Sequence, residues 1–410
     1  MTQSFQDRLA QYAALAVEIG VNVQPGKDLY ITAQISAAEF VRAAAKHAYT
    51  IGAKQVHVEW IDNQLVRTRF ELAPEDSFGD YPAWQVQGRL EVAKEGGSFL
   101  TVISEDPDLL AGIDPKRLGS YEKARQAAFT PVRAYTMTNK AAWAIVGVPS
   151  QAWANKVFPG LPEAERVDAL WNAIFAATRV DEADPIAAWR AHAAKLDEKA
   201  AWLNEQRFTE LRYRAPGTEL SIGLDAKHIW KSAGSVTTSG TTFIPNLPTE
   251  EVFTSPDRSR VNGTVTSSKP LSYNGTLIDN FSLTFKDGQV VDFTAEKEYD
   301  SLKNLIDTDE GSKFLGEVAL VPHRSPISDT NLLFFNTLFD ENAACHLAIG
   351  FGFPFCLDGG LTMSKEELAA HGLNQSLTHV DFMIGRADLD IDGVRADGTV
   401  EPIFRAGNWA

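Results

Sequence analysis

The sequence has little cysteine and no long apolar run. Cys345 and Cys356 are its two cysteines, which excludes a disulfide-based scaffold and a zinc site with four cysteine ligands. No segment approaches the roughly 20 consecutive apolar residues that a membrane-spanning helix requires. The amino terminus lacks a basic stretch followed by an apolar one, so no signal peptide is expected. Together these absences predict a soluble, cytoplasmic protein without a membrane partner.

Basic residues are also in the minority. The 38 lysines and arginines are outnumbered by 54 aspartates and glutamates, and the formal net charge is −16. Such a chain repels polyanions, so nucleic acid is not expected as a partner. The acidic surplus suits a protein that binds cations, although many cytosolic enzymes share it. A length of 410 residues predicts two domains rather than one.

Residues 1–195 are predicted to form an α/β domain with a parallel sheet. Three short apolar runs are typical of strands, at residues 29–32, 56–60 and 99–103. Strands that alternate with helices form parallel sheets with right-handed crossovers. Ser36 and Glu39 predict a capping box at the start of the helix after the first strand. From about residue 120 to 206 the pattern is helical, and its last part predicts a long helix between the domains.

Residues 196–410 are predicted to form an α+β domain that is largely antiparallel. Residues 281–285 alternate between apolar and polar side chains, which predicts a half-buried strand. Five pairs favour the backbone angles of hairpin turns, namely Asn262-Gly263, Asn274-Gly275, Asp287-Gly288, Asp392-Gly393 and Asp397-Gly398. Strands joined by tight turns are antiparallel, so we expect antiparallel β-structure with a few helices.

One hydrophobic strand near the carboxyl end carries possible metal ligands. In a strand over residues 377–384, side chains alternate, so His379 and Asp381 lie on one face and Val380 and Phe382 on the other. An imidazole and a carboxylate two residues apart can bind a metal ion. The alternative is an ordinary hydrogen bond between the histidine and the aspartate on a solvated face.

A second histidine, His346, lies in the alanine-rich segment 339–350. This composition predicts a helix that is capped by Asp340 and ends at Gly350. Small neighbours leave room for an ion beside the histidine, but a core histidine bonded to a backbone carbonyl is the alternative. In such a helix Cys345 points about 100° away from His346. We therefore interpret Cys345 as a small buried residue and not as a ligand or a nucleophile.

Two glutamates complete the set of candidate ligands. Glu251 lies in a short polar segment, and Glu317 opens the apolar run 318–322. A carboxylate that enters a hydrophobic strand requires a cationic partner, because its burial is otherwise costly. A divalent ion is a natural partner in a chain this acidic. Arg324 is the alternative, since it is close in sequence to Glu317.

Four segments together resemble a known family. The stretches TEEVFTSP, FLGEVALVPHRSPIS, DENAACHLAIG and SLTHVDFMIG are similar, in order and in spacing, to signature segments of the M29 family of thermophilic-type metalloaminopeptidases. The likeness extends over the whole chain. It implies an N-terminal α/β domain, a C-terminal catalytic domain that carries the metals, and a homodimer.

The resemblance also implies a site for two divalent ions, for which cobalt, zinc and magnesium have been described in the family. The family's ligands fall on Glu251, Glu317, His346, His379 and Asp381. We expect Glu317 to bridge the ions, because a carboxylate has two oxygens. One ion would then bind Glu251 and His346, and the other His379 and Asp381. Glu317 or Glu341 is expected to transfer the protons of the reaction.

One position departs from the family. A tyrosine usually follows the histidine of the third segment at a distance of seven residues, and this chain has Phe353 there. A phenyl ring can neither bind a metal nor donate a hydrogen bond. Metal binding is expected to survive this change, because five ligands remain, whereas the turnover rate is in question.

The sequence therefore predicts a metal-dependent aminopeptidase that uses water activated by two metal ions to release N-terminal residues from peptides. Two alternatives keep the metals: a hydrolase of non-peptide amides or esters, and a metal-binding protein that has lost catalysis. A nucleotide-binding enzyme is disfavoured. Residues 33–36, which follow the first strand, lack the glycine pattern that binds phosphate.

Overall fold

The computed structural model describes residues 3–104, 106–273 and 276–410, which form two compact units. The first unit contains the chain up to His192 together with Gly234–Pro248, and the second contains Ala193–Ala233 and Thr249–Ala410. Helix α8 (Pro185–Gln206) includes the first boundary between them. Among the described residues, no helix combines the length and the apolarity that crossing a membrane requires.

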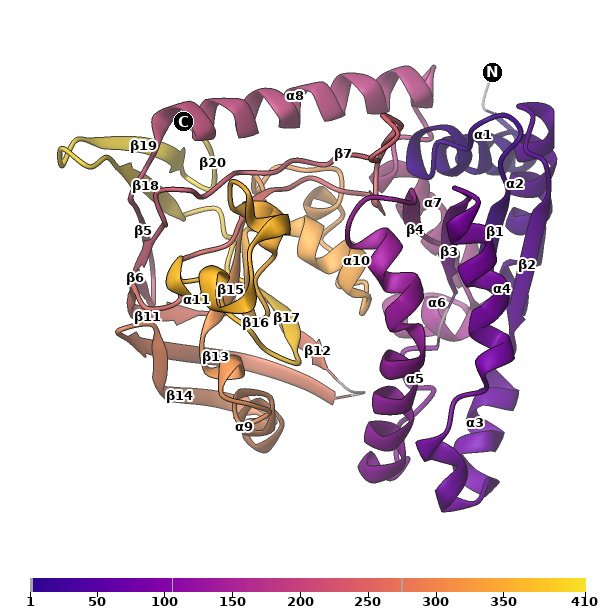
Figure 1. The fold of residues 1–410 in the computed structure, drawn as a ribbon, viewed down its shortest axis with the longest axis horizontal. Helices are drawn as coiled ribbons and strands as arrows, with labels where there is room; N and C mark the ends of the chain where they lie inside the picture. Colours follow the sequence, from indigo (N-terminus) through magenta and orange to yellow (C-terminus); the bar gives the residue numbers. More distant parts are fainter. Residues whose placement is uncertain (1–2, 105, 274–275) are drawn as a thin grey trace. The chain divides into compact units, whose positions relative to one another are not determined.

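The first unit is built on a five-stranded parallel sheet, as the sequence predicts. Its strands lie in the order β2-β1-β3-β4-β9, and Figure 1 labels the first four of them. Their bounds are β1 Leu29–Gln34, β2 Val56–Ile61, β3 Ser98–Ile103, β4 Trp143–Gly147 and β9 Asn246–Leu247. Strand β4 lies within the region that the sequence pattern assigned to helices. The helical assignment was wrong for these five residues, which are buried or half-buried. So short an apolar run is not recognised as a strand when the sequence on both sides has a helical pattern.

Helices separate these strands along the chain. They are α1 Phe5–Leu15, α2 Ala38–Thr50, α3 Asn63–Leu72, α4 Ala83–Lys94, α5 Pro115–Thr136, α6 Gln151–Val157 and α7 Glu163–Ala177, with a π-helical turn at Ala16–Gly20. A short hairpin of β7 (Ser235–Val236) and β8 (Thr242–Phe243) precedes β9. The capping box at Ser36 and Glu39 is not formed, because α2 starts later and the Ser36 hydroxyl lies 2.8 Å from the Ser104 hydroxyl.

The second unit contains a nine-stranded antiparallel sheet. Its bounds are β5 Glu210–Ala215, β6 Thr218–Gly223, β11 Val261–Thr266, β12 Leu271–Tyr273, β13 Thr276–Lys286, β14 Gln289–Lys297, β18 Asp390–Val394, β19 Val400–Arg405 and β20 Asn408–Trp409. Helix α9 (Tyr299–Ile306) contacts the β13–β14 hairpin (Figure 1). The largely antiparallel fold predicted for this half is confirmed.

The turn predictions succeed at two pairs and fail at two. Asp287-Gly288 joins β13 to β14, and Asp397-Gly398 joins β18 to β19. Asn262-Gly263 and Asp392-Gly393 instead lie inside β11 and β18. At Gly393 a Cβ atom would lie 2.6 Å from the Phe208 ring, so this glycine serves close packing and not a turn. Asn274-Gly275 lies outside the described residues.

A four-stranded antiparallel sheet completes the second unit. It has the order β10-β15-β16-β17, with β10 Val252–Thr254, β15 Leu315–Leu320, β16 His346–Gly350 and β17 His379–Met383. One hydrophobic cluster includes Leu211 and Ile222 of the large sheet and Val318, Leu347 and Phe382 of this sheet. One face of the four-stranded sheet therefore packs against the hydrophobic core.

The remaining short elements of the second unit connect these strands. They are helices α10 Thr337–Asp340 and α11 Lys365–Ala370 and the 3-10 turns at Gly311–Lys313, Ser328–Thr330, Glu341–Ala343, Pro354–Cys356 and Gly360–Thr362. In the first unit, 3-10 turns lie at Ile35–Ala37 and Glu75–Gly79.

Candidate metal centre

The segment around His346 is a central strand and not the predicted helix. All five residues of β16 are buried, and the strand pairs with β15 on one side and with β17 on the other. These pairings outweigh the helix propensity of alanine and leucine. Asp340 is not a cap either, because its carboxylate accepts the backbone N–H groups of Phe334 and Asn336 at 2.7 and 3.0 Å. Cys345 is buried as expected, with its Sγ 3.2 Å from the Val321 carbonyl oxygen.

The register of these strands gathers the candidate ligands on one face. Ala348 lies opposite both Glu317 in β15 and Asp381 in β17, and Gly350 lies opposite His379. Side chains of directly opposed residues project from the same side of a sheet. His346 shares that side, since it is two residues from Ala348. The core occupies the other side, so the polar side chains are held on the face that the core leaves free.

Five side chains meet on this face. The His346 Nε2 atom is 3.1 Å from Glu251 Oε2 and 3.8 Å from Glu317 Oε1. The His379 Nε2 atom is 3.1 Å from Glu317 Oε2 and 3.5 Å from Asp381 Oδ1. These contacts form two triads that share Glu317, and within each triad one ligand atom of every residue lies within 4.8 Å of the others.

Both imidazoles have their Nε2 atoms directed at carboxylates. The Nδ1 atom of His346 is 3.1 Å from the Ala344 carbonyl oxygen, and that of His379 is 2.7 Å from the Phe351 carbonyl oxygen. A carbonyl oxygen only accepts, so each Nδ1 carries the proton and donates it. A neutral ring then presents its Nε2 lone pair to the carboxylates, which is repulsive unless a proton or a metal cation lies between them.

The electrostatics of the cluster reflect this need for positive charge. Burial lowers the pKa of His346, but its hydrogen bond to Glu251 and the charges of the neighbouring carboxylates outweigh burial and raise that pKa to about 10. The pKa of His379 is raised well above its usual range, because Asp381 and Glu317 together outweigh burial. Burial raises the pKa of Glu317 to about 7 although His379 opposes the rise.

Glu341 lies near both triads without belonging to either. Burial and the charges of Asp381 and Glu251 raise the pKa of its carboxyl well above the usual range. Its carboxylate accepts a hydrogen bond of 3.3 Å from Asn342 Nδ2. Arg324 is not the cationic partner of Glu317, because its guanidinium is 72% exposed and pairs with Asp329 at 2.7 Å.

The donor set fits a divalent cation. Three carboxylates and two imidazoles are ligands that zinc and cobalt accept, whereas magnesium prefers oxygen donors alone. The Oδ1 atom of Asp381 is buried and accepts no hydrogen bond from the residues that the structure describes. A buried carboxylate oxygen without a donor requires a cation for compensation.

An aromatic cluster beside the ligands was only partly foreseen. The Phe353 ring lies 4.8 Å from the His379 ring, 5.0 Å from the Phe355 ring and 6.0 Å from the Phe351 ring. Phe253 contacts Phe353 and Phe355 at 6.1 and 6.2 Å. Sequence reasoning singled out Phe353 for its missing hydroxyl and overlooked the other three rings. The sequence signal for two of them was the phenylalanine at every second position of residues 351–355.

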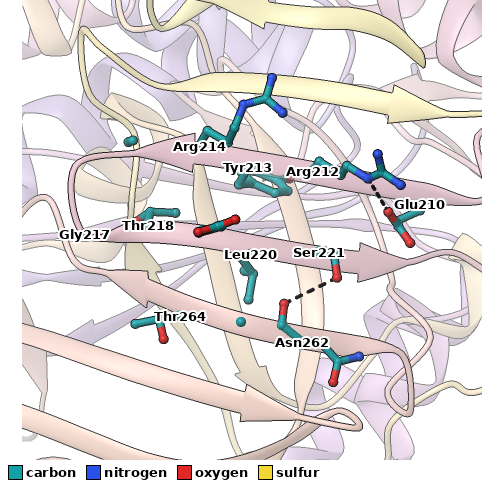
Figure 2. A pocket seen from close by; sticks show the side chains of 13 residues that line it. Glu210, Arg212, Tyr213, Arg214, Gly217, Thr218, Leu220, Ser221, Asn262 and Thr264 are labelled. Carbon is teal, nitrogen blue, oxygen red and sulfur yellow. Dashed lines mark hydrogen bonds and ion pairs between the residues drawn. The ribbon is translucent and has the colours of Figure 1, made fainter.

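A surface depression of the second unit lies away from this cluster. It has a volume of about 1030 Å³ on the strands β5, β6 and β11. Figure 2 shows Arg212 beside Glu210, to which it donates a hydrogen bond of 2.6 Å. Arg214 pairs with Asp392. Because these arginines already have acidic partners, we do not assign the depression a ligand.

Comparison with known proteins identifies the family. The sequence model of the thermophilic metalloprotease family M29 matches residues 5–409. The chain belongs to the M29 family. The resemblance seen in the four segments is thereby confirmed, and with it the hydrolase class of the family.

Relatives of this M29 chain match it over its whole length. Aminopeptidase AmpS of Bacillus subtilis is 53% identical over 99% of each chain. Aminopeptidase T of Thermus thermophilus is 45% identical over 99% of each chain. A solved structure of wild-type AmpT from Thermus thermophilus superposes with a TM-score of 0.94 at 44% identity and covers 99% of this chain and 100% of that one. The predicted fold class agrees with that structure.

Proposed function

We propose that this M29 chain is an aminopeptidase that depends on divalent metal ions bound by Glu251, Glu317, His346, His379 and Asp381. The observation that carries the proposal is the pair of triads that share Glu317 on one sheet face. Names of relatives support the substrate class, because AmpS and aminopeptidase T are both named aminopeptidases. Peptides with a free amino terminus would then be the substrates.

The distances support two ions with Glu317 between them. Its Oε1 faces His346 and its Oε2 faces His379, so each oxygen belongs to a different triad. We favour zinc or cobalt over magnesium because two of the five ligands are imidazoles. Bound divalent ions lower the pKa of water towards neutrality and polarise the substrate carbonyl.

Glu341 is the side chain that we propose for proton transfer. Both oxygens of Glu317 already face imidazoles, whereas Glu341 is a nearby carboxylate outside the triads. A raised pKa suits a group that takes a proton from the attacking water and returns one to the leaving amine. The aromatic rings beside His379 make that side of the site apolar.

Further parts of the proposal extend beyond the site. We propose that residues 196–410, apart from the segment Gly234–Pro248 of the first unit, form the catalytic domain, since all six named side chains belong to the second unit. A homodimer is proposed on the family resemblance. A cytoplasmic location is proposed on the low cysteine content, because disulfides mark oxidising compartments.

Chelation tests the proposal directly. The protein is treated with excess chelator, and its activity on leucine p-nitroanilide is measured before and after addition of Zn²⁺ or Co²⁺. We expect chelation to abolish activity and metal to restore it. His346→Gln should lose both metal and activity, whereas the matched control His371→Gln should keep them, because His371 pairs with Asp225 outside the cluster. Full activity in excess chelator would contradict the proposal.

Phe353 supports one alternative, a metal-binding protein with reduced or lost catalysis. Its ring packs on the candidate ligand His379 without offering a hydroxyl. Two ions per chain together with no turnover of any unblocked peptide would establish that alternative. A hydrolase of other amides is tested by N-acetylated leucine p-nitroanilide, since an aminopeptidase requires the free amine and should not cleave it.

A further inference from the structure

A lysine projects from the same sheet face as the candidate metal ligands. Lys231 and Phe253 exchange two backbone hydrogen bonds, of 2.8 and 2.9 Å, as a directly opposed antiparallel pair. Phe253 lies opposite Ala319 in β15, and Ala319 lies opposite His346 in β16. Opposed residues share a face, so Lys231 is on the side of His346. Its neighbour Trp230 belongs to the core on the other side, as the alternation requires.

The side chain of Lys231 is partly buried. Among the residues that the structure describes, its ammonium makes no hydrogen bond or ion pair. Its charge nevertheless reaches the cluster. Burial raises the pKa of the Cys356 thiol, the charge of Glu317 adds to the rise, and the charge of Lys231 opposes it. The Cys356 thiol therefore lies close enough to both Glu317 and Lys231 to be affected by their charges.

Aromatic side chains line the path between the ligands and Lys231. Phe353 contacts His379 at 4.8 Å, and Phe253, which lies directly opposite Lys231, contacts Phe353 at 6.1 Å. All of these rings are partly exposed. A surface with a cation at one end, an apolar wall, and carboxylates with imidazoles at the other end can bind a short peptide along its length.

Building on the aminopeptidase function proposed above, we propose that Lys231 binds the C-terminal carboxylate of dipeptide substrates. The segment at Lys231 pairs with β10, and β10 pairs with β15. Two strand spacings of about 4.8 Å, or roughly 10 Å, therefore separate the backbone at Lys231 from β15. One extended residue after the scissile bond spans about 3.5 Å. The flexible four-carbon stem of lysine covers the remainder. An ammonium and a carboxylate then form a charge-assisted hydrogen bond beside the apolar wall.

The wild-type enzyme provides the first test. Leu-Ala and Leu-Ala amide differ only in the terminal carboxylate, and both keep the free amine and the scissile bond. We expect kcat/KM to be roughly tenfold higher for Leu-Ala, which corresponds to one modest charge-assisted contact. The difference should lie in KM and should shrink at high ionic strength. Equal kcat/KM values for the two substrates would overturn the proposal.

Variants of Lys231 provide the second test. Lys231→Met keeps the apolar stem and removes the charge, so it should lose roughly tenfold in kcat/KM on Leu-Ala and little on Leu-Ala amide or leucine p-nitroanilide. Lys231→Arg should retain most of the preference. The control Lys227→Met removes an exposed lysine four residues away and should behave as wild type. A loss of equal size on all three substrates would overturn carboxylate binding.

Two further outcomes remain distinguishable. A gain on Leu-Asp amide over Leu-Ala amide that disappears in Lys231→Met would overturn the proposal in favour of a side-chain carboxylate. If Lys231→Met does not fold, the proposal is tested with Lys231→Gln and with the comparison of Leu-Ala and Leu-Ala amide on the wild-type enzyme. The metal-loaded wild-type enzyme must cleave leucine p-nitroanilide in the same assay. If it does not cleave this substrate, the proposed aminopeptidase function is wrong. The role of Lys231 is tested separately, by the ratio of kcat/KM for Leu-Ala to kcat/KM for Leu-Ala amide.

Discussion

Removal of the metal ions should make the stability of the protein fall as the pH rises. In the chelated protein, protons on the two imidazoles supply positive charge next to Glu251, Glu317 and Asp381. Alkaline pH removes these protons and leaves buried carboxylates against each other and against nitrogen lone pairs. Bound divalent ions supply the positive charge instead, so the metal-loaded protein should depend much less on pH.

The expected size follows from His346. Burial lowers its pKa, but the hydrogen bond to Glu251 and the carboxylate charges raise it from 6.5 to about 10. A folded-state pKa above the unfolded value gives stability that is fully present below 6.5 and is lost as the pH rises through 10. Each pH unit within that window costs about 1.4 kcal/mol. Between pH 6.5 and about pH 9 the chelated protein should therefore lose roughly 3 kcal/mol.

Glu317 changes stability in the same direction. Burial raises its pKa from 4.5 to about 7, so its ionisation destabilises the chelated fold increasingly across that range. The two groups interact, and their effects overlap instead of adding. The combined expectation is a steady loss of stability from acidic to alkaline pH.

Urea denaturation at pH 6.5 and pH 9, with chelator or with Zn²⁺, measures this effect. Amide hydrogen exchange in β15 and β16 reports on the same sheet separately. The stabilisation by zinc should be larger at pH 9 than at pH 6.5. His346→Gln in chelator should show a shallower pH dependence than wild type. A chelated protein that is equally stable or more stable at pH 9 would refute the electrostatic reasoning.

Two other substitutions have defined outcomes. Asp392→Asn removes the buried carboxylate that pairs with Arg214 and Arg405, whose side chains are half exposed, so we expect a loss of about 1–2 kcal/mol at neutral pH in urea denaturation. Burial raises the pKa of Asp392 but both arginines together lower it below 3.8, so this difference should vanish as the pH falls below that value. Phe353→Tyr adds a hydroxyl beside His379 and should raise kcat on leucine p-nitroanilide; an unchanged kcat would show that the missing hydroxyl is not a functional loss.

The strands that the sequence pattern identified are those whose own residues alternate or form isolated apolar runs. Strands β1, β2 and β3 are examples. The turn between β13 and β14 was likewise identified from its own residues, Asp287-Gly288. β16 was predicted as a helix because alanine and leucine favour helices, and its strand form depends on two partners distant in sequence. Local propensity does not contain that information.

The assignment of all five candidate ligands rested on the family resemblance. Strand alternation by itself predicts only that His379 and Asp381 lie on one face, as β17 has them. Glu317 was singled out because a carboxylate at the start of an apolar run requires a cationic partner. The sequence did not reveal Lys231, since it faces the site only through its backbone pairing with Phe253. Cross-strand pairing of short, separate segments leaves no periodic signal in either one.

The cross-strand register decides whether the site exists. A slip of one residue between β16 and β17 would move His379 and Asp381 into the core and expose Val380 and Phe382. Gly350 helps to fix this register, because it lies opposite His379 with φ of 109° and a Cβ there would lie 2.1 Å from the Thr378 carbonyl oxygen. Any larger residue would push β17 away from β16. The close approach that only glycine permits therefore keeps His379 within reach of the shared glutamate.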